Sequence, residues 1–282
     1  LIHLNIHHYY FFLNNSAHYY LYHIFSNLIK ILQILEINVE KLIPITQPTK
    51  FKNVVIPDES FFYANDRRFF TVEYQETINR IKNFALKNLT EISQKKIYFF
   101  HGRKQIGEER IVEYFKSKGY ATVRPETLPL EEQLNILANC TNFASTEGSC
   151  SHNSIFLKDN SEVILIPRSF MGKFQAALNE VNNVNVTYVD SAISLFHFQK
   201  DNYGPFFYII SKQLKKFFGD DSADEYSEED LITFLQYVRY SMSHGYKENI
   251  KLKEYYSTIL PEFYSQLVQR KDLMEKFGVF IK

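Results

Sequence analysis

Two segments of the sequence carry residue types and spacings that could bind an anion. The first, residues 143–168, reads FASTEGSCSHNSIFLKDNSEVILIPR, where serines, a glycine, a cysteine and an acid separate two apolar runs. This pattern predicts a strand that ends at Thr146, a tight turn, a helix that begins near His152 and a second strand over residues 163–166. Backbone N–H groups at such a helix start favour an anion. We therefore expect the turn around Gly148 to bind one.

The second segment is HGRKQIGEER, residues 101–110, which follows a predicted strand. Arg103 and Lys104 come directly after that strand, and Arg110 lies about two helical turns further on. Such side chains can give charge-assisted hydrogen bonds to a phosphate at the edge of a sheet. A solvated surface turn would carry the same residues, so both interpretations stand on these residues alone.

Several common motifs are absent. The sequence has no Gly-x-Gly-x-x-Gly and no P-loop, which argues against dinucleotide and ATP binding. No two aspartates stand two positions apart, so there is no Asp-x-Asp site for a metal-bridged diphosphate. His-Glu-x-x-His and Gly-x-Ser-x-Gly are also missing, which removes the commonest metalloprotease and hydrolase signatures. We therefore expect neither a metal site nor a resident cofactor.

The segments that must position these residues alternate between strand and helix patterns. Strands are predicted at residues 95–100, 120–125, 141–146, 161–167 and 183–190, with helices in the segments 102–119, 128–140 and 151–160. This alternation predicts a parallel sheet with right-handed crossovers. Ligands of such sheets bind beyond the carboxyl ends of the strands. The loops expected there are residues 101–110, 124–132 and 145–153.

The regions on either side have other patterns. Apolar residues at helical spacing predict an amphipathic helix over residues 21–32, and His18 falls on a stripe beside its apolar face. That stripe is either a solvated edge, the commoner case for an isolated histidine, or the lip of a cleft. A strand is predicted over residues 53–60 and a helix over residues 71–88. From Asp201 onward the chain becomes helical and aromatic, with an acidic linker at residues 219–230.

Composition restricts the class of protein. The 282 residues are 45% hydrophobic with no formal net charge, which predicts a globular fold and no basic field for nucleic acid. Cys140 and Cys150 have no metal-ligand or disulfide spacing, so we expect a reducing compartment, the cytoplasm. The first 29 residues lack Asp, Glu, Lys and Arg, but five histidines and four asparagines argue against a membrane span, and no signal-peptide pattern is present. Because the chain begins without Met, we expect its natural start to lie further upstream.

The run GRKQIGEER…GYATVRPETLPLEEQLNILANCTNFASTEGSCSHNSIFLKDNSEVILIPR resembles the donor-side half of glycosyltransferase family sixty-one. Members of that family typically show an Arg after a strand, a Pro-Glu-x-Leu, a Glu-Gln helix and a His-Gly-Ala-Gly-Leu-x-Asn turn. The similarity covers about seventy residues in the right order. Upstream, NNSAHYYLYHIFSNLIKIL looks like the family's histidine-aromatic helix, with His18 at the histidine.

The sequence departs from the family pattern at the turn. Glu147 replaces the family's histidine, and Ser149 and Cys150 replace its alanine and second glycine, while Gly148 and Asn153 match. An acid beside a diphosphate would repel it, so we expect Glu147 to face a sugar hydroxyl or the acceptor. In the upstream helix, Tyr22 stands where the family has an acid four residues after the histidine, which argues against a simple His–carboxylate dyad.

The resemblance implies an α/β protein of the GT-B type, with two Rossmann-like domains whose parallel sheets face a cleft. On this basis we expect an acceptor-side domain with a connecting helix over residues 1–90, a donor-binding domain over residues 91–198 and a helical region over residues 199–282. The activity implied is metal-independent transfer from a nucleotide sugar to a saccharide acceptor. No cofactor, metal or nucleic acid is expected.

The resemblance also assigns site residues. Arg103 and Lys104 are expected to bind the diphosphate, and Pro125 and Glu126 to lie near the nucleobase or ribose. Gly148, Ser149, His152 and Asn153 are expected to support the phosphates and the sugar. A base must deprotonate the acceptor hydroxyl, for which His18 is the first candidate and Glu147 the second.

Analogy extends this expectation to biological context. Heavy use of Asn, Lys, Phe and Tyr is typical of AT-rich bacterial genomes, where such enzymes commonly build capsular or other surface polysaccharides, so we expect a cytoplasmic enzyme at the inner face of the membrane. Two alternatives remain. A nucleotide-sugar epimerase shares the GT-B architecture and would convert the donor without an acceptor. A non-catalytic protein that binds a phosphorylated ligand or serves in assembly would leave the donor intact.

Overall fold

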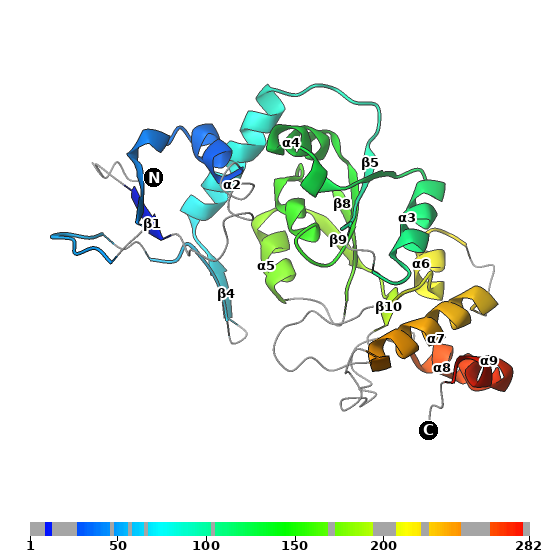
Figure 1. The fold of residues 1–282 in the computed structure, drawn as a ribbon. Helices are drawn as coiled ribbons and strands as arrows, with labels where there is room; N and C mark the ends of the chain where they lie inside the picture. Colours follow the sequence, from blue (N-terminus) through cyan, green and yellow to red (C-terminus); the bar gives the residue numbers. More distant parts are fainter. Residues whose placement is uncertain are drawn as a thin grey trace.

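The computed structural model describes most of the chain, namely residues 9–12, 27–45, 48–55, 58–64, 67–102, 105–168, 173–193, 207–220, 226–243 and 260–278. Three predicted site residues, His18, Arg103 and Lys104, lie outside the described residues. Figure 1 shows a central sheet with helices on both sides and smaller elements toward each terminus.

A five-stranded parallel sheet forms the centre of the molecule, as the alternating pattern predicts. Its strand order is β6-β5-β7-β8-β9. The strands are β5 (Lys96–Phe99), β6 (Ala121–Val123), β7 (Asn142–Thr146), β8 (Glu162–Ile166) and β9 (Asn185–Tyr188). Phe99 lies opposite Val123 on one side and Ser145 on the other. The strand order therefore reverses between β5 and β7, which is the position where sheets of this kind bind ligands.

Both faces of the sheet are buried, because apolar side chains alternate along each strand. Tyr98, Ala144 and Ile164 pack on one face, which α3 (Glu108–Ser117) and α6 (Lys212–Phe217) cover. Phe99 and Phe143 pack on the other face beneath α4 (Leu130–Asn139). The 3-10 helix η4 (Ser151–Phe156) packs against α5 (Lys173–Val181) on that side (Figure 1). Burial on both faces explains why these strands read as continuous apolar runs.

The N-terminal elements lie beside α2 (Val72–Lys87), which packs against α4. Two strands, β1 (Tyr9–Phe12) and β2 (Leu42–Ile45), pair in parallel, and residues 27–34 are helical. A hairpin joins β3 (Phe61–Ala64) to β4 (Arg67–Phe70). The strand predicted over residues 53–60 is wrong, since residues 53–55 and 58–60 are not in a strand. Pro57 has no N–H to donate to a ladder, so pairing begins only at Phe61.

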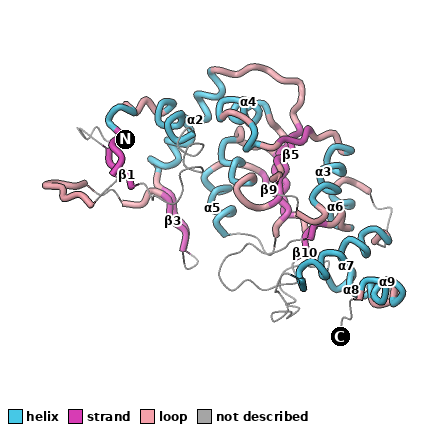
Figure 2. The backbone as a smooth tube through the Cα atoms, in the orientation of Figure 1, coloured by secondary structure: helices cyan, strands magenta, loops and turns pink. Residues whose placement is uncertain are grey.

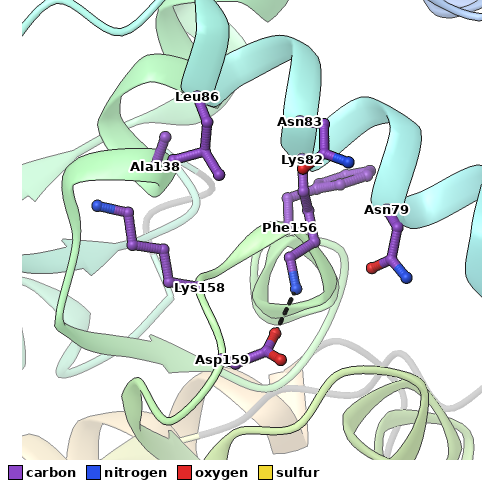
Figure 3. A pocket seen from close by; sticks show the side chains of 8 residues that line it. All are labelled: Asn79, Lys82, Asn83, Leu86, Ala138, Phe156, Lys158 and Asp159. Carbon is purple, nitrogen blue, oxygen red and sulfur yellow. Dashed lines mark hydrogen bonds and ion pairs between the residues drawn. The ribbon is translucent and has the colours of Figure 1, made fainter.

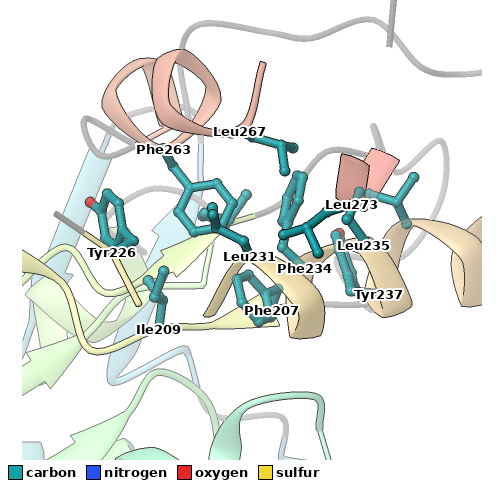
Figure 4. Packing of buried hydrophobic residues seen from close by; sticks show 12 residues of the cluster. Phe207, Ile209, Tyr226, Leu231, Phe234, Leu235, Tyr237, Phe263, Leu267 and Leu273 are labelled. Carbon is teal, nitrogen blue, oxygen red and sulfur yellow. The ribbon is translucent and has the colours of Figure 1, made fainter. Parts of the chain in front are cut away.

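The C-terminal region builds a separate aromatic core on the opposite side of the sheet from the N-terminal elements (Figures 1 and 2). It contains β10 (Ala192–Ile193), β11 (Phe207–Tyr208), α7 (Glu228–Ser243), α8 (Leu260–Leu267) and α9 (Lys271–Phe277). Phe207, Phe234 and Phe263 pack face to edge at its centre (Figure 4). The region predicted as helical from Asp201 therefore also contributes the short strand β11.

The segment predicted as an acidic linker is in part structural. Residues 228–230 form the first turn of α7, and Asp230 is buried. Asp230 forms an ion pair with Arg110 of α3 and accepts hydrogen bonds from Ser227. The acidic residues at this point therefore belong to the start of a helix, where the peptide dipoles stabilise negative charge. The ion pair with Arg110 connects that helix start to the sheet domain.

Candidate functional site

The candidate site lies where the carboxyl ends of β5 and β7 diverge. The loop after β5 contains His101, and the turn after β7 spans Glu147 to Cys150. The hydroxyl of Ser149 lies 3.2 Å from Nε2 of His101, so the two loops touch at the switch point of the sheet. The structure therefore brings together the two segments that the sequence analysis selected, although Arg103 and Lys104 are outside the described residues.

The turn itself uses most of its backbone N–H groups. Several N–H groups already donate hydrogen bonds within the turn or to β8, namely those of Glu147, Gly148, Ser151, His152 and Asn153. Gly148 N–H donates to the Ser151 hydroxyl at 3.1 Å, and that hydroxyl donates back to the Gly148 carbonyl at 2.7 Å. The expectation that many N–H groups of this turn are open to a ligand is therefore revised. The N–H and the hydroxyl of Ser149 are candidate donors at the turn tip, where the hydroxyl also contacts His101.

A buried polar network holds the turn in place. The Ser151 hydroxyl also lies 2.7 Å from Oε1 of Gln175, which is 1% exposed. Gln175 in turn donates to the Ser154 hydroxyl and to Asn179 on α5. Because every member of this chain has a partner, the network can fix the position of the turn as a rigid support.

Two predicted site residues, His152 and Asn153, support the turn from within. The side-chain amide of Asn153 donates to the backbone carbonyls of Ser149 and Cys150 at 3.3 and 3.1 Å. The half-buried His152 ring packs edge-on against Phe174 at 5.0 Å between centroids. Burial lowers the pKa of His152, and the charge of Arg168 lowers it further. A neutral imidazole therefore prevails there at neutral pH.

Arg168, to which the sequence alone gave no role, is a cation that lies against the turn. Gly148 has φ +138°, and a Cβ placed on it would lie 2.9 Å from Nη2 of Arg168. The backbone N–H of Arg168 donates to the Glu147 carboxylate at 3.3 Å. Burial raises the pKa values of Glu108 and Tyr208, and the positive charge of Arg168 partly opposes that rise. Gly148 is therefore favoured by its backbone, because φ +138° strains any L side chain, and an added Cβ would also have to displace the Arg168 guanidinium. The sequence signal for Arg168 was its place just beyond a parallel strand.

Glu126, predicted near the nucleobase or ribose, helps to hold the loop after β5. Its Oε1 accepts the Gly102 N–H at 3.1 Å and two N–H groups of Arg124, each at 3.1 Å. Partial burial acts to raise the pKa of Glu126, but these hydrogen bonds outweigh it and the net shift is downward. Pro125 is buried in the 3-10 helix η3 (Pro125–Thr127) beside it. Glu126 is thus an ionised side chain at the rim of the site.

Arg110 was a further candidate to donate hydrogen bonds to a phosphate, but it forms an ion pair with another part of the protein. Its guanidinium pairs with Asp230 of α7, whose side chain is 5% exposed. The helical rotation of α3 turns Arg110 toward the C-terminal core and away from the strand ends. Its role is therefore structural, which sequence spacing alone did not indicate.

A cavity of about 360 Å³ lies at the other end of the sheet (Figure 3). Its walls come from α2, α4, the end of η4 and the segment between η4 and β8. Lys82, which lines it, already donates to Asp159 and Asn182, each at 2.7 Å. We therefore assign the candidate site to the carboxyl ends of β5 and β7, where polar and charged side chains converge from separate strands.

In the described part of the chain, no group of three or more His, Cys, Asp or Glu residues could hold a metal ion. No helix among the same residues is long and apolar enough to cross a membrane.

Comparison with known proteins gives one family match. The family model described as Glycosyltransferase 61 matches residues 9–164, which is more than half of the 282 residues. The matched range includes the loop after β5, the turn after β7 and the segment containing His18. A search of curated proteins finds no match.

Proposed function

Because the chain belongs to the Glycosyltransferase 61 family and is therefore a glycosyltransferase, we propose that its donor is a nucleotide sugar bound at the carboxyl ends of β5 and β7. One observation carries this proposal. The turn at Ser149 and the loop at His101 meet at the switch point of a parallel sheet, with the guanidinium of Arg168 against the turn. The switch point of a parallel sheet with a cation beside it suits an anionic ligand.

In the proposed complex, cationic side chains take the role that a metal has in other transferases. Arg103 and Lys104 bind the diphosphate, and Arg168 adds positive charge beneath the turn. The Ser149 hydroxyl donates to a phosphate or to the sugar. As the bond between the anomeric carbon and the leaving oxygen breaks, negative charge develops on the nucleoside diphosphate, and these donors stabilise it. The proposed reaction is therefore independent of metal.

The acceptor hydroxyl attacks the anomeric carbon from the opposite face, so the proposed transfer inverts the configuration. Its proton passes to a base in the cleft. His18 remains the first candidate, in the segment expected to form the acceptor side. Glu147 is second, because its carboxylate already accepts the Arg168 N–H, and a carboxylate stabilised in this way is a weaker base.

The two-domain GT-B arrangement and a role in capsular or other surface polysaccharide synthesis at the inner face of the membrane belong to the same proposal. Support for the first comes from the family and from the parallel pairing of β1 with β2. Support for the second comes from composition alone.

A thermal-shift screen of nucleotide sugars tests the proposal. A donor present at a hundred times its dissociation constant adds about 2.7 kcal/mol to the free energy of unfolding. Nucleotide release that requires an acceptor would then identify transfer, whereas donor conversion without an acceptor would identify an epimerase. If no nucleotide sugar raises the melting temperature, the proposed donor class is wrong.

A further inference from the structure

One stripe of α2 lines the cavity of about 360 Å³ at the end of the sheet opposite the candidate site. Its members stand three or four positions apart, and therefore on the same helix face, and they are Asn79, Lys82, Asn83 and Leu86. Asparagine is among the weaker helix formers. Helix stability therefore does not account for two asparagines within this one helix.

Lys82 is held in the wall of the cavity. Its side chain is 12% exposed, and its ammonium group donates to Asp159 and Asn182, each at 2.7 Å. Asn182 is 3% exposed, and its amide donates to the backbone carbonyls of Ser154 and Leu157 at 2.9 and 3.1 Å. An ammonium group has three N–H donors, of which these acceptors in the described part of the chain use two. The third donor is available to a ligand in the cavity.

The other wall of the cavity faces α2 from the segment before β8. Figure 3 shows Lys158 and Asp159 on that side, with Phe156 between the two walls. Phe156 is partly buried and packs against apolar residues of α2 and α4. The side-chain amides of Asn79 and Asn83 form no hydrogen bond with another described residue. The cavity thus presents uncommitted polar groups around an aromatic ring.

The chemistry of this lining fits a sugar better than a phosphate. Sugar hydroxyls both donate and accept hydrogen bonds, and the lining offers ammonium and amide donors together with amide and carboxylate acceptors. Phe156 and Leu86 add apolar surface for the C–H groups of a sugar ring. A phosphate would be repelled by the Asp159 carboxylate. The volume lies within the range of roughly 300–1,000 Å³ that is usual for small-molecule sites.

We propose that this cavity is a second, non-catalytic site that binds a saccharide. Lys158 and Asp159 precede β8 whereas Arg168 follows it, so the length of β8 separates the cavity from the candidate donor site. The identity of the saccharide rests on the proposed function, because we take it to be the acceptor or the product that transfer lengthens. The site then retains that saccharide on the enzyme, away from the reacting atoms.

The first test locates binding by NMR. The full chain is labelled with ¹⁵N in asparagine, and the side-chain amide signals of Asn79, Asn83 and Asn153 are assigned from single alanine variants. The protein is titrated with the methyl glycosides of glucose, galactose, N-acetylglucosamine and glucuronic acid, and with inorganic phosphate. We expect at least one glycoside to shift the signals of Asn79 and Asn83 together and to saturation. If no glycoside shifts both signals, or if phosphate alone does so, the proposal is overturned.

The second test compares the affinity for the best glycoside among variants of α2. Asn83→Ala removes one amide from the cavity, and we expect binding to weaken by roughly threefold to tenfold. Arg80→Ala is the control, because Arg80 is exposed on the same helix and does not line the cavity. It should change the affinity by less than about twofold. Alanine is the better helix former, so Asn83→Ala should be at least as stable as the parent, and weaker binding cannot then result from unfolding. Unchanged affinity in Asn83→Ala would contradict the site.

Nucleotide sugars separate this inference from the proposed function. A glycoside that shifts Asn79 and Asn83 in a protein that no nucleotide sugar stabilises would count against the proposed donor class and leave the saccharide site standing. A nucleotide sugar that raises the melting temperature and shifts Asn153, while no glycoside shifts the cavity amides, would do the reverse.

Discussion

The guanidinium of Arg168 lies against the Cα of Gly148, so that a Cβ on Gly148 would approach Nη2 to 2.9 Å. The glycine therefore admits a cation to the underside of the turn. Any side chain at this position must both adopt φ +138° and displace Arg168. The relationship links a backbone requirement to the charge available at the candidate site.

Gly148→Ala is expected to destabilise the protein by roughly 1–3 kcal/mol and to weaken donor binding. Gly119→Ala is the matched control, because Gly119 also has a positive φ, +83°, but no atom lies within 4 Å of its added Cβ. Urea unfolding of both variants separates backbone strain from the contact with Arg168. Equal losses of stability with unchanged donor affinity would show that Arg168 plays no part in binding.

Arg103→Ala and His18→Ala separate binding from chemistry. If Arg103 binds the diphosphate, its removal costs a charge-assisted contact of roughly 1.5–3 kcal/mol, and donor affinity falls about tenfold to a hundredfold. If His18 is the base, donor affinity barely changes while turnover falls by about a hundredfold or more. Calorimetry and nucleotide release measure the two quantities. Normal turnover in a folded His18→Ala enzyme would make Glu147 the leading candidate base.

Transfer is expected to survive a chelator. The proposed site stabilises the leaving diphosphate with arginine, lysine and hydroxyl donors, which need no metal. Nucleotide release is measured in EDTA and again after addition of manganese. Activity that disappears in EDTA and returns with manganese would refute the proposed mechanism.

The stability of the protein should carry a signature of Glu108. Its pKa is raised from 4.5 to about 7 in the folded state, so the folded protein retains a proton that the unfolded chain releases within this range. This group therefore contributes stability that is lost as the pH rises from about 4.5 to about 7. We compare the melting temperatures of the parent and of Glu108→Gln across that range. As the pH rises, we expect any advantage of the parent to shrink or to reverse. A difference in melting temperature between the two proteins that does not change with pH would contradict a raised pKa of Glu108.

Arg110→Ala is expected to lower stability without affecting donor affinity. The substitution leaves Asp230, whose side chain is 5% exposed, without its cation, and we expect a loss of about 2–3 kcal/mol, between the values for surface and fully buried pairs. Lys116→Ala, which breaks the exposed pair with Glu113, is the control and should change stability by less than about 1 kcal/mol. A large fall in donor affinity in Arg110→Ala would show instead that Arg110 contributes to donor binding.

Local sequence patterns were sufficient to predict the parallel sheet and the loops that follow its strands. Apolar runs such as residues 142–146 and 162–166 specify buried strands whatever their partners are, and their alternation with helices leaves the loops at one edge. The family followed from the same segment, because its motif residues are near one another in the chain. Even here local pattern failed at residues 53–60, where Pro57 interrupts an apolar run.

Only the tertiary structure decided which polar groups remain available to a ligand. The N–H groups of the turn looked open in the sequence, but the Ser151 hydroxyl, held by Gln175 from α5, takes one of them. Glu108 and Glu109 are adjacent acids of the same type, yet packing of α3 against β5 and β11 buries the first and leaves the second in water. Secondary structure follows from neighbours within a few residues, whereas burial and charge pairing depend on contacts between segments far apart in the chain. Sequence patterns alone therefore could not predict the surroundings of Arg168 and Glu108.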